Sequence, residues 1–105
     1  MPIGKADPPL SSGVYALTFD SKVVYIGEAK GASGLRDRIL SKHVYGDDNH
    51  AVQRALKPRF PDRRERRDFI RQEVCVQWVE IPDRNVCAVV ERLLIWLLKP
   101  RWNAT

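Results

Sequence analysis

The sequence has little cysteine and no long apolar run. Its two cysteines, Cys75 and Cys87, are too few and too far apart to form a zinc site by themselves, and we expect both to be buried thiols. No uninterrupted apolar stretch reaches the length of about 18 residues that a membrane helix needs. The segment from Met1 to Asp7 also lacks the apolar core of a secretion signal. These absences argue against a membrane protein and a disulfide, and favour a soluble cytoplasmic protein.

The chain is long enough for one domain. It has 105 residues, of which 44% are hydrophobic, so a single core can form but a second one cannot. Residues 1–12 contain three prolines, two serines and one glycine, which predicts a flexible N-terminal arm that is extended or poorly ordered. We therefore expect a single domain over residues 13–105.

Positive charge is concentrated in one segment. The formal net charge is +5, and residues 54–71 contain eight basic and three acidic residues, 8 − 3 = +5, so this segment accounts for the whole excess. Such a patch attracts the phosphate backbone of nucleic acids, although a solvated helix face has the same composition. We interpret this basic segment as a candidate nucleic-acid-binding surface. Its candidate nucleic-acid-binding residues are Arg54, Lys57, Arg59, Arg63, Arg64, Arg66, Arg67 and Arg71.

Three β-rich runs alternate with helical patterns. Residues 14–19 and 22–26 predict an antiparallel hairpin, and residues 73–81 predict a third strand. Helices are expected from Leu35 to about Tyr45, in a short segment ending near Leu56, from Arg63 to Gln72 after an Asp62 cap, and from Arg84 to about Leu98 after an Asp83 cap. The predicted class is α/β (α+β), with a small, mainly antiparallel three-stranded sheet flanked by helices.

The register of the hairpin decides where its two tyrosines point. Tyr15 and Tyr25 share a face directly opposite each other only if paired positions sum to 40, which requires a loop of odd length. A two-residue turn at Asp20-Ser21 would place the two rings on opposite faces. We expect the odd-length loop.

The last helix is apolar on most sides and carries one acidic residue. Its main apolar stripe consists of Val86, Val89, Val90, Leu93, Leu94 and Leu97. Glu91 lies away from the centre of that stripe, beside Cys87. A carboxylate among apolar neighbours needs a metal ion, a base or a buried donor to stay ionised, so Glu91 is a candidate functional residue.

Five sequence elements occur in a characteristic order. Gly13-Val14-Tyr15 and Tyr25-Ile26-Gly27 lie on the two strands of the hairpin, and the downstream elements are Leu35-Arg36-Asp37-Arg38, Glu91 and Pro100-Arg101-Trp102-Asn103. With this order and spacing, the chain from Gly13 to Asn103 resembles the GIY-YIG nuclease family. The first tripeptide has valine where the family has isoleucine, and the second matches unaltered. The resemblance implies a stand-alone catalytic domain that hydrolyses phosphodiester bonds in DNA.

The resemblance also implies roles for individual residues. Glu91 would be the one protein ligand of a Mg²⁺ or Mn²⁺ ion, and Arg38, rather than Arg36, would stabilise charge on the phosphoryl group. Tyr15 would be the general base, a role that requires nearby cations to lower the pKa of the tyrosine. Tyr25 would orient water or phosphate. Asn103 would position one of these groups or close the wall of the site.

Three features depart from the family pattern. Residues 44–72 are longer than a minimal family domain needs and contain the basic patch, so we interpret them as a basic helical insertion that grips the substrate. The other two features leave alternatives open. His43 follows Arg38 by five residues instead of four, so it is either a proton donor or shuttle or a surface histidine. Glu28 adds negative charge where phosphate should bind, unless Lys30 neutralises it; Lys30 is itself a candidate nucleic-acid-binding residue. A non-catalytic nucleic-acid-binding module on the same scaffold is therefore the alternative function. Binding of RNA, the biological pathway, and a monomeric or homodimeric state also stay open.

Overall fold

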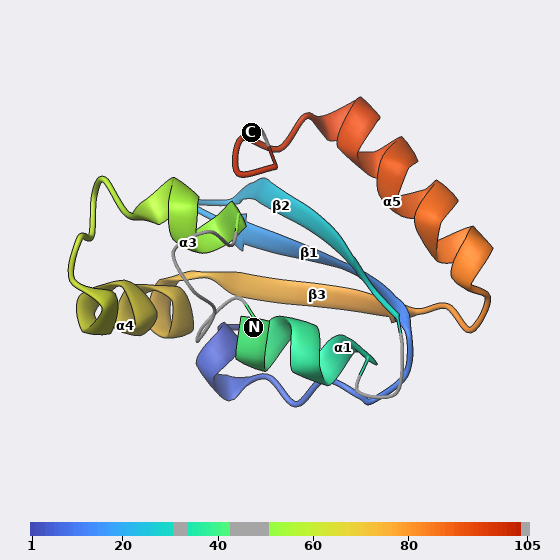
Figure 1. Ribbon diagram of the computed structural model, residues 1–105, viewed down its shortest axis with the longest axis horizontal. Coiled ribbons are helices and arrows are strands. Elements are labelled where there is room, and N and C mark those ends of the chain that lie inside the picture. Colours follow the sequence, from blue (N-terminus) through green and yellow to red (C-terminus); the bar gives the residue numbers. More distant parts are fainter. Residues whose placement is uncertain (31–33, 43–50, 104–105) are drawn as a thin grey trace.

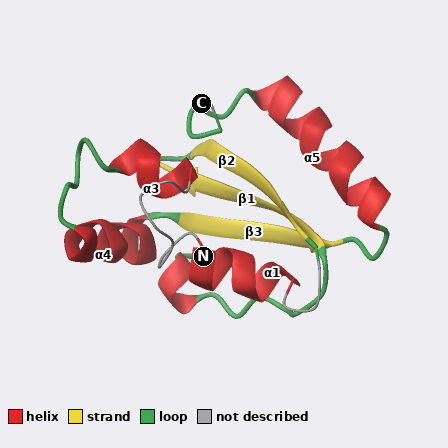
Figure 2. Cartoon of the chain, in the orientation of Figure 1, coloured by secondary structure: helices red, strands yellow, loops and turns green. Residues whose placement is uncertain are grey.

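A three-stranded antiparallel sheet forms the centre of the fold (Figure 1). Strand β1 spans Gly13–Phe19, β2 spans Lys22–Ala29 and β3 spans Cys75–Glu80, and their spatial order is β2-β1-β3. The computed structural model describes residues 1–30, 34–42 and 51–103. Helices flank the sheet, which confirms the predicted α+β class (Figure 2).

The helices begin and end close to the predicted positions. They are a short 3₁₀ helix at Ile3–Lys5, α1 at Gly34–Arg36 continued by a π-helical segment at Asp37–Lys42, α3 at Ala51–Leu56, α4 at Arg63–Glu73 and α5 at Arg84–Leu98. Asp62 caps α4 by accepting hydrogen bonds from the backbone N–H groups of Arg64 and Glu65. Asp83 caps α5 in the same way. Both caps confirm the sequence prediction.

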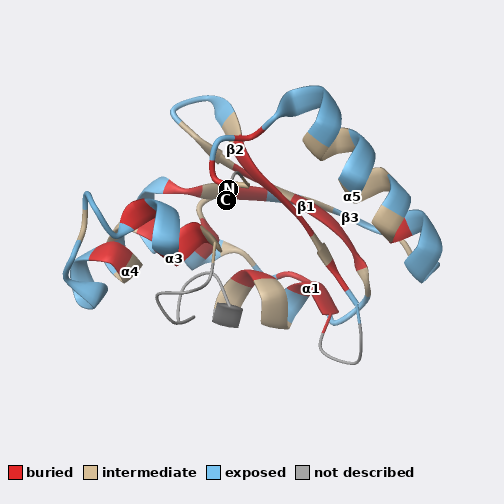
Figure 3. Cartoon of the chain, turned by 45° about the horizontal axis from the view of Figure 1, so that its top comes forward, coloured by how far each residue is buried: buried red, intermediate tan, exposed pale blue. Residues whose placement is uncertain are grey.

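The two faces of the sheet carry separate cores, because side chains alternate between faces along a strand. Tyr15, Leu17 and Tyr25 belong to the larger core, which also includes residues of α1, α3 and α4. Val14 and Ile26 lie on the opposite face and pack against α5 through the buried Cys87. Figure 3 shows the buried residues of the strands between these two layers.

The observed hairpin register differs from the predicted one. The turn has only two residues, Asp20 and Ser21, both with positive φ, as in the tight turns that connect antiparallel strands. Such a turn alone would separate the two tyrosine rings. A β-bulge restores the alternation, however, because Thr18 pairs with Val23 whereas Leu17 pairs with Tyr25. Paired positions near the tyrosines therefore sum to 42 instead of 40, and both rings still lie on one face.

The N-terminal residues are packed onto the domain, although the sequence predicts a flexible arm for residues 1–12. Ile3 is buried, and its backbone N–H donates to the Val74 carbonyl at 2.9 Å. The Val76 N–H donates to the Met1 carbonyl at 2.9 Å, and the Leu35 N–H donates to the Ser11 carbonyl at 2.9 Å. These bonds connect both ends of the segment to the fold, so proline content did not indicate disorder here.

The assignment of residues 44–72 as an insertion stays a prediction.

Helix α5 packs on the sheet through only part of the predicted apolar stripe. Val90 and Leu94 are half-buried and pack against the core that contains the fully buried Cys87, whereas Val89 is 65% exposed. The predicted stripe was therefore only partly correct, because a helix that is apolar on nearly every side does not indicate which side packs. Both cysteines are free, but Cys75 is only half-buried. None of the described helices is long and apolar enough to cross a membrane.

Candidate functional site

The two glycines of the tripeptides make room for neighbouring groups. Gly27 lies directly opposite Tyr15, and a Cβ atom there would overlap the Tyr15 ring and hydroxyl. A Cβ atom on Gly13 would overlap the carbonyl oxygen of Val79 on β3. Glycine at these positions therefore lets the tyrosine lie flat against β2 and lets β1 approach β3 closely.

Tyr15 and Tyr25 are buried side by side on one sheet face. Their ring centroids are 6.2 Å apart with planes inclined by 33°. Burial raises the pKa of Tyr15 well above its ordinary value, and the nearby Tyr25 raises it further, although a hydrogen bond and the charge of Arg38 act in the opposite direction. Burial is also the main cause of the raised pKa of Tyr25. Both hydroxyls are therefore protonated near neutral pH.

Arg38 is held beside the tyrosines by the helix that follows β2. Leu35 and Ile39 on this helix are fully buried, and they anchor the turn that carries Arg38. The Arg38 side chain is hydrogen-bonded to Tyr15. Its buried Nε atom has no hydrogen-bond partner within the part of the chain that the structure describes. A planar guanidinium with an unused donor is suited to an anion such as phosphate.

Glu91 reaches the site from the opposite sheet face. Burial raises the pKa of its carboxyl, and the negative charge of the Glu28 carboxylate raises that pKa further. A hydrogen bond from the Glu28 backbone N–H lowers the pKa, and so do the positive charges of Lys30 and Arg38. Lys30 forms an ion pair with Glu28 at 3.3 Å. The neutralisation of Glu28 by Lys30 that the sequence left open is therefore present. The site extends across β2, with tyrosines on one face and carboxylates on the other.

The carboxylates provide a partial donor set for a divalent cation. Among the described residues, no group of three His, Cys, Asp or Glu side chains is placed to hold a metal ion. The buried Oε2 atom of Glu28 has no hydrogen-bond partner among those residues, and Glu91 is destabilised by the neighbouring negative charge. Both conditions fit a hard cation that takes few protein ligands and keeps other oxygen ligands from water or phosphate.

Asn103 binds the free edge of β2 next to Tyr25. The Ile26 N–H donates to Asn103 Oδ1 at 2.8 Å, and Asn103 Nδ2 donates to the Ile26 carbonyl at 2.8 Å. The Trp102 N–H donates to the Val24 carbonyl at 2.9 Å. The C-terminal turn thus pairs with an edge strand whose backbone groups would otherwise face solvent. Asn103 positions the strand that carries Tyr25.

The predicted basic residues of segment 54–71 differ in their exposure. Arg54, Lys57, Arg59, Arg63, Arg64 and Arg71 are exposed, and Arg67 is half-buried. Arg66 is fully buried, with Nη1 placed 3.5 Å from the Gln53 carbonyl oxygen, so its assignment to nucleic-acid binding was wrong. It lies on the side of α4 that packs on the domain, which a count of charges does not reveal. His43 lies outside the described residues.

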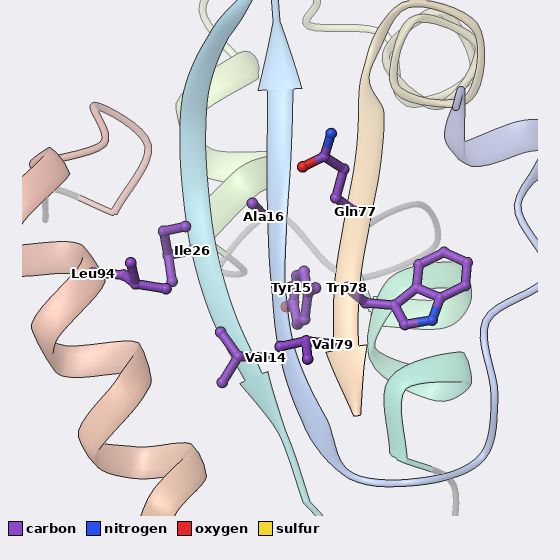
Figure 4. A pocket seen from close by; sticks show the side chains of 8 residues that line it. All are labelled: Val14, Tyr15, Ala16, Ile26, Gln77, Trp78, Val79 and Leu94. Atoms are coloured by element: carbon purple, nitrogen blue, oxygen red, sulfur yellow. The ribbon is translucent and has the colours of Figure 1, made fainter. Parts of the chain in front are cut away.

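Two pockets lie on opposite faces of the sheet. Figure 4 shows one of about 220 Å³ on the α5 side, lined mainly by apolar residues that include Val14, Ile26 and Leu94. The other, of about 430 Å³, lies at the turn end of the hairpin and includes Phe19 and Arg101. Neither residue is among the candidates expected from the sequence. The adjacent basic and aromatic residues Arg101-Trp102 were the available signal.

Solved structures of one nuclease domain share this fold. The chain is similar to the GIY-YIG N-terminal endonuclease domain of UvrC from Thermotoga maritima, in two tyrosine-to-phenylalanine point mutants bound to the catalytic divalent cation. The TM-score is 0.61 at 19% identity for both; the alignments cover 98% and 97% of this chain and 91% of each domain. An asparagine-to-alanine mutant of the same domain gives a TM-score of 0.59 at 19% identity, and the alignment covers 95% of this chain and 88% of the domain. The resemblance is thus confirmed for the fold.

Comparison of the sequence with protein families and curated proteins gives no match. At this level of identity, the structural likeness defines the fold of the domain, and its chemistry has to be argued from the residues themselves.

Proposed function

We propose that the protein is a metal-dependent endonuclease that hydrolyses phosphodiester bonds in DNA. The observation that carries the proposal is the meeting of Tyr15, Tyr25, Arg38 and Glu91 across β2, where the charges of Arg38 and Glu91 act in opposite directions on the pKa values of both tyrosines. They do so on a fold that GIY-YIG endonuclease domains share. Hydrolysis of a phosphodiester needs an oriented water and stabilisation of negative charge, and this set of groups supplies both.

Each residue has a defined task in this proposal. Arg38 binds the scissile phosphate, with its unused Nε as one donor. Tyr15 and Tyr25 orient the attacking water by hydrogen bonds, since their raised pKa values disfavour the base role first expected for Tyr15. Glu91 holds a Mg²⁺ or Mn²⁺ ion, which would act as a Lewis acid on the phosphoryl oxygens. Asn103 fixes the position of Tyr25 through Ile26.

The exposed basic residues hold the DNA backbone. Arg54 lies on α3 and Lys57 directly follows it, and Arg63, Arg64 and Arg71 lie on α4, all with exposed side chains. Contacts of this kind give affinity without sequence preference and weaken as salt increases. Lys30 is held by Glu28 and serves to limit the negative charge of the site. The proposed partner is DNA.

A cleavage assay tests the proposal. Supercoiled plasmid and branched or flapped DNA are incubated with Mg²⁺ or Mn²⁺ and the wild-type protein, Glu91→Ala or Arg38→Ala. We expect nicked or linear products from the wild type and strongly reduced cleavage by both variants. Cleavage that persists unchanged in both variants would assign the activity to a contaminant or to another site.

A non-catalytic DNA-binding module is the second candidate. Glu28 favours it, because one oxygen of this carboxylate is buried near the proposed phosphate site and repels an anion. Measurement of DNA affinity against salt concentration separates the two functions. Tight, salt-sensitive binding without cleavage under any divalent metal would support the binding module.

A further inference from the structure

The pocket at the turn end of the hairpin combines aromatic rings with two arginines. Its wall is formed by the end of β1, by α3 and the loop after it, by α4 and by the C-terminal turn. The residues that line it are Phe19, Ala55, Leu56, Arg59, Phe69, Arg101 and Trp102. None of these is acidic, and its volume of about 430 Å³ is in the range of small-molecule sites.

The aromatic rings are fixed in place by one another. Phe19 lies edge-on to Phe69 at 5.1 Å between centroids, and it is stacked on Trp102 at 6.5 Å with planes inclined by 21°. The Arg59 guanidinium lies over the Phe69 ring, 5.6 Å from its centroid. Phe69 is also stacked on Phe60, with 4.6 Å between centroids and planes inclined by 28°. Phe19 and Phe69 are only half-buried, so part of each side chain is accessible. A cluster of aromatic side chains with cations at its margin suits a planar ring joined to an anion.

We propose that this pocket binds an unpaired nucleotide of the DNA, with its base on the Phe19 and Phe69 rings and its phosphate at Arg59 and Arg101. The proposal rests on the proposed function, because it names the form of DNA that the same domain takes. Bases within a duplex have both faces covered by their neighbours, so an aromatic pocket receives a base only where the strand is unpaired. The preferred substrate is therefore DNA with a single-stranded segment beside the cleaved bond.

The pocket is connected to the candidate catalytic residues. Trp102 lines the pocket and donates its N–H to Val24, the residue before Tyr25. The next residue, Asn103, holds both backbone groups of Ile26, the residue after Tyr25. One turn of the chain therefore supports both sites.

The test compares two DNA probes that carry the same phosphates. Each is a labelled duplex with a single-stranded tail, made either of thymidines or of abasic residues, and binding is measured in EDTA so that no cleavage occurs. The pocket variant is Ala55→Glu, which places an acid at an exposed position of the wall. Gln72→Glu, at an exposed position of α4 outside this pocket, is the control for charge. Circular dichroism establishes that both variants are folded.

We expect the wild type and Gln72→Glu to bind the thymidine tail on the order of tenfold more tightly than the abasic tail, as for a base stacked on aromatic side chains. Ala55→Glu should lose this preference. Equal affinity for the two tails in the wild type, or a preference retained in Ala55→Glu, would overturn the proposal. A wild type that prefers the thymidine tail but does not cleave DNA in Mg²⁺ would refute the nuclease function and support the pocket as a nucleotide site. A wild type that cleaves DNA but binds both tails equally would support the nuclease function and refute the pocket as a nucleotide site.

Discussion

Glu91 on α5 accepts a hydrogen bond from the backbone N–H of Glu28 on β2, while the Glu28 carboxylate raises its pKa. The bond orients Glu91 toward the strand that carries Tyr25, and the like charge disfavours the ionised form that a metal needs. A divalent cation would remove that conflict. The same contact thus connects the placement of α5 on the sheet with the proposed metal site.

Divalent cations should stabilise the wild-type protein. At a Mg²⁺ concentration about ten times the dissociation constant, binding to the folded state adds about 1.4 kcal/mol to the free energy of unfolding. Glu91→Gln should lose this gain, whereas Glu73→Gln, at an exposed position on α4, should retain it. Thermal unfolding with Mg²⁺ and with NaCl of equal ionic strength measures the effect. An equal gain in the wild type and Glu91→Gln would exclude Glu91 as the ligand.

Gly27→Ala should destabilise the fold through Tyr15. The new methyl group overlaps the Tyr15 ring, and overpacking of this kind costs about 1–3 kcal/mol. Replacement of the ring by Tyr15→Leu should reduce the cost of Gly27→Ala, since the two residues act as a pair. Urea unfolding of the four proteins in this cycle measures the coupling. Additive effects would show that the two residues do not constrain each other.

Asn103→Ala should loosen the free edge of β2. It removes two hydrogen bonds to Ile26, each with a net value of about 1 kcal/mol. Asn85→Ala is the matched control, because Asn85 is exposed and its backbone N–H, not its side chain, bonds to the Asp83 cap. We expect urea unfolding to show a loss of about 2 kcal/mol for Asn103→Ala and a change within about 0.5 kcal/mol for the control. Similar losses in both variants would contradict the role of Asn103.

The buried tyrosines should make the protein sensitive to alkali. Their folded-state pKa values lie above the unfolded value of about 10, so the folded state keeps protons that the unfolded state releases. Their contribution to stability is complete below pH of about 10 and falls above it, by about 1.4 kcal/mol per pH unit for each tyrosine. Tyr15→Phe should flatten the decline in unfolding free energy above pH 10 and leave the slope at pH 8 unchanged. Identical slopes above pH 10 would contradict the raised pKa.

The sequence predicted the elements better than their contacts. Helix α5 has the predicted bounds because Asp83 caps its start and a proline follows its end. Which side of it packs was only partly predicted, since apolar residues surround the helix. Val90 and Leu94 of the predicted stripe pack on the sheet beside the buried Cys87, but Val89 is exposed. The bulge between Leu17 and Thr18 was also missed, because nothing local in a valine-rich strand specifies an extra residue.

The motif residues of the candidate site could be selected from the sequence because their spacing is distinctive. The structure brings Arg38 and Glu91 close enough to the two tyrosines to affect their pKa values. The catalytic roles of these residues stay predictions. The pocket at Phe19 and Arg101 was not predictable, since it combines the hairpin turn with two helices and the C-terminus. Such a site depends on tertiary packing that no local pattern records.

The most direct test of the proposed function is the single-turnover rate of DNA cleavage as Mg²⁺ is titrated, compared between wild type, Glu91→Gln and the control Glu73→Gln. Loss of the electrostatic stabilisation that Glu91 provides should lower the rate by on the order of 10²-fold or more. The control should cleave at the wild-type rate, because Glu73 is an exposed residue at the end of α4. A Glu91→Gln protein that cleaves DNA as fast as the wild type at every Mg²⁺ concentration would contradict the proposed metal site.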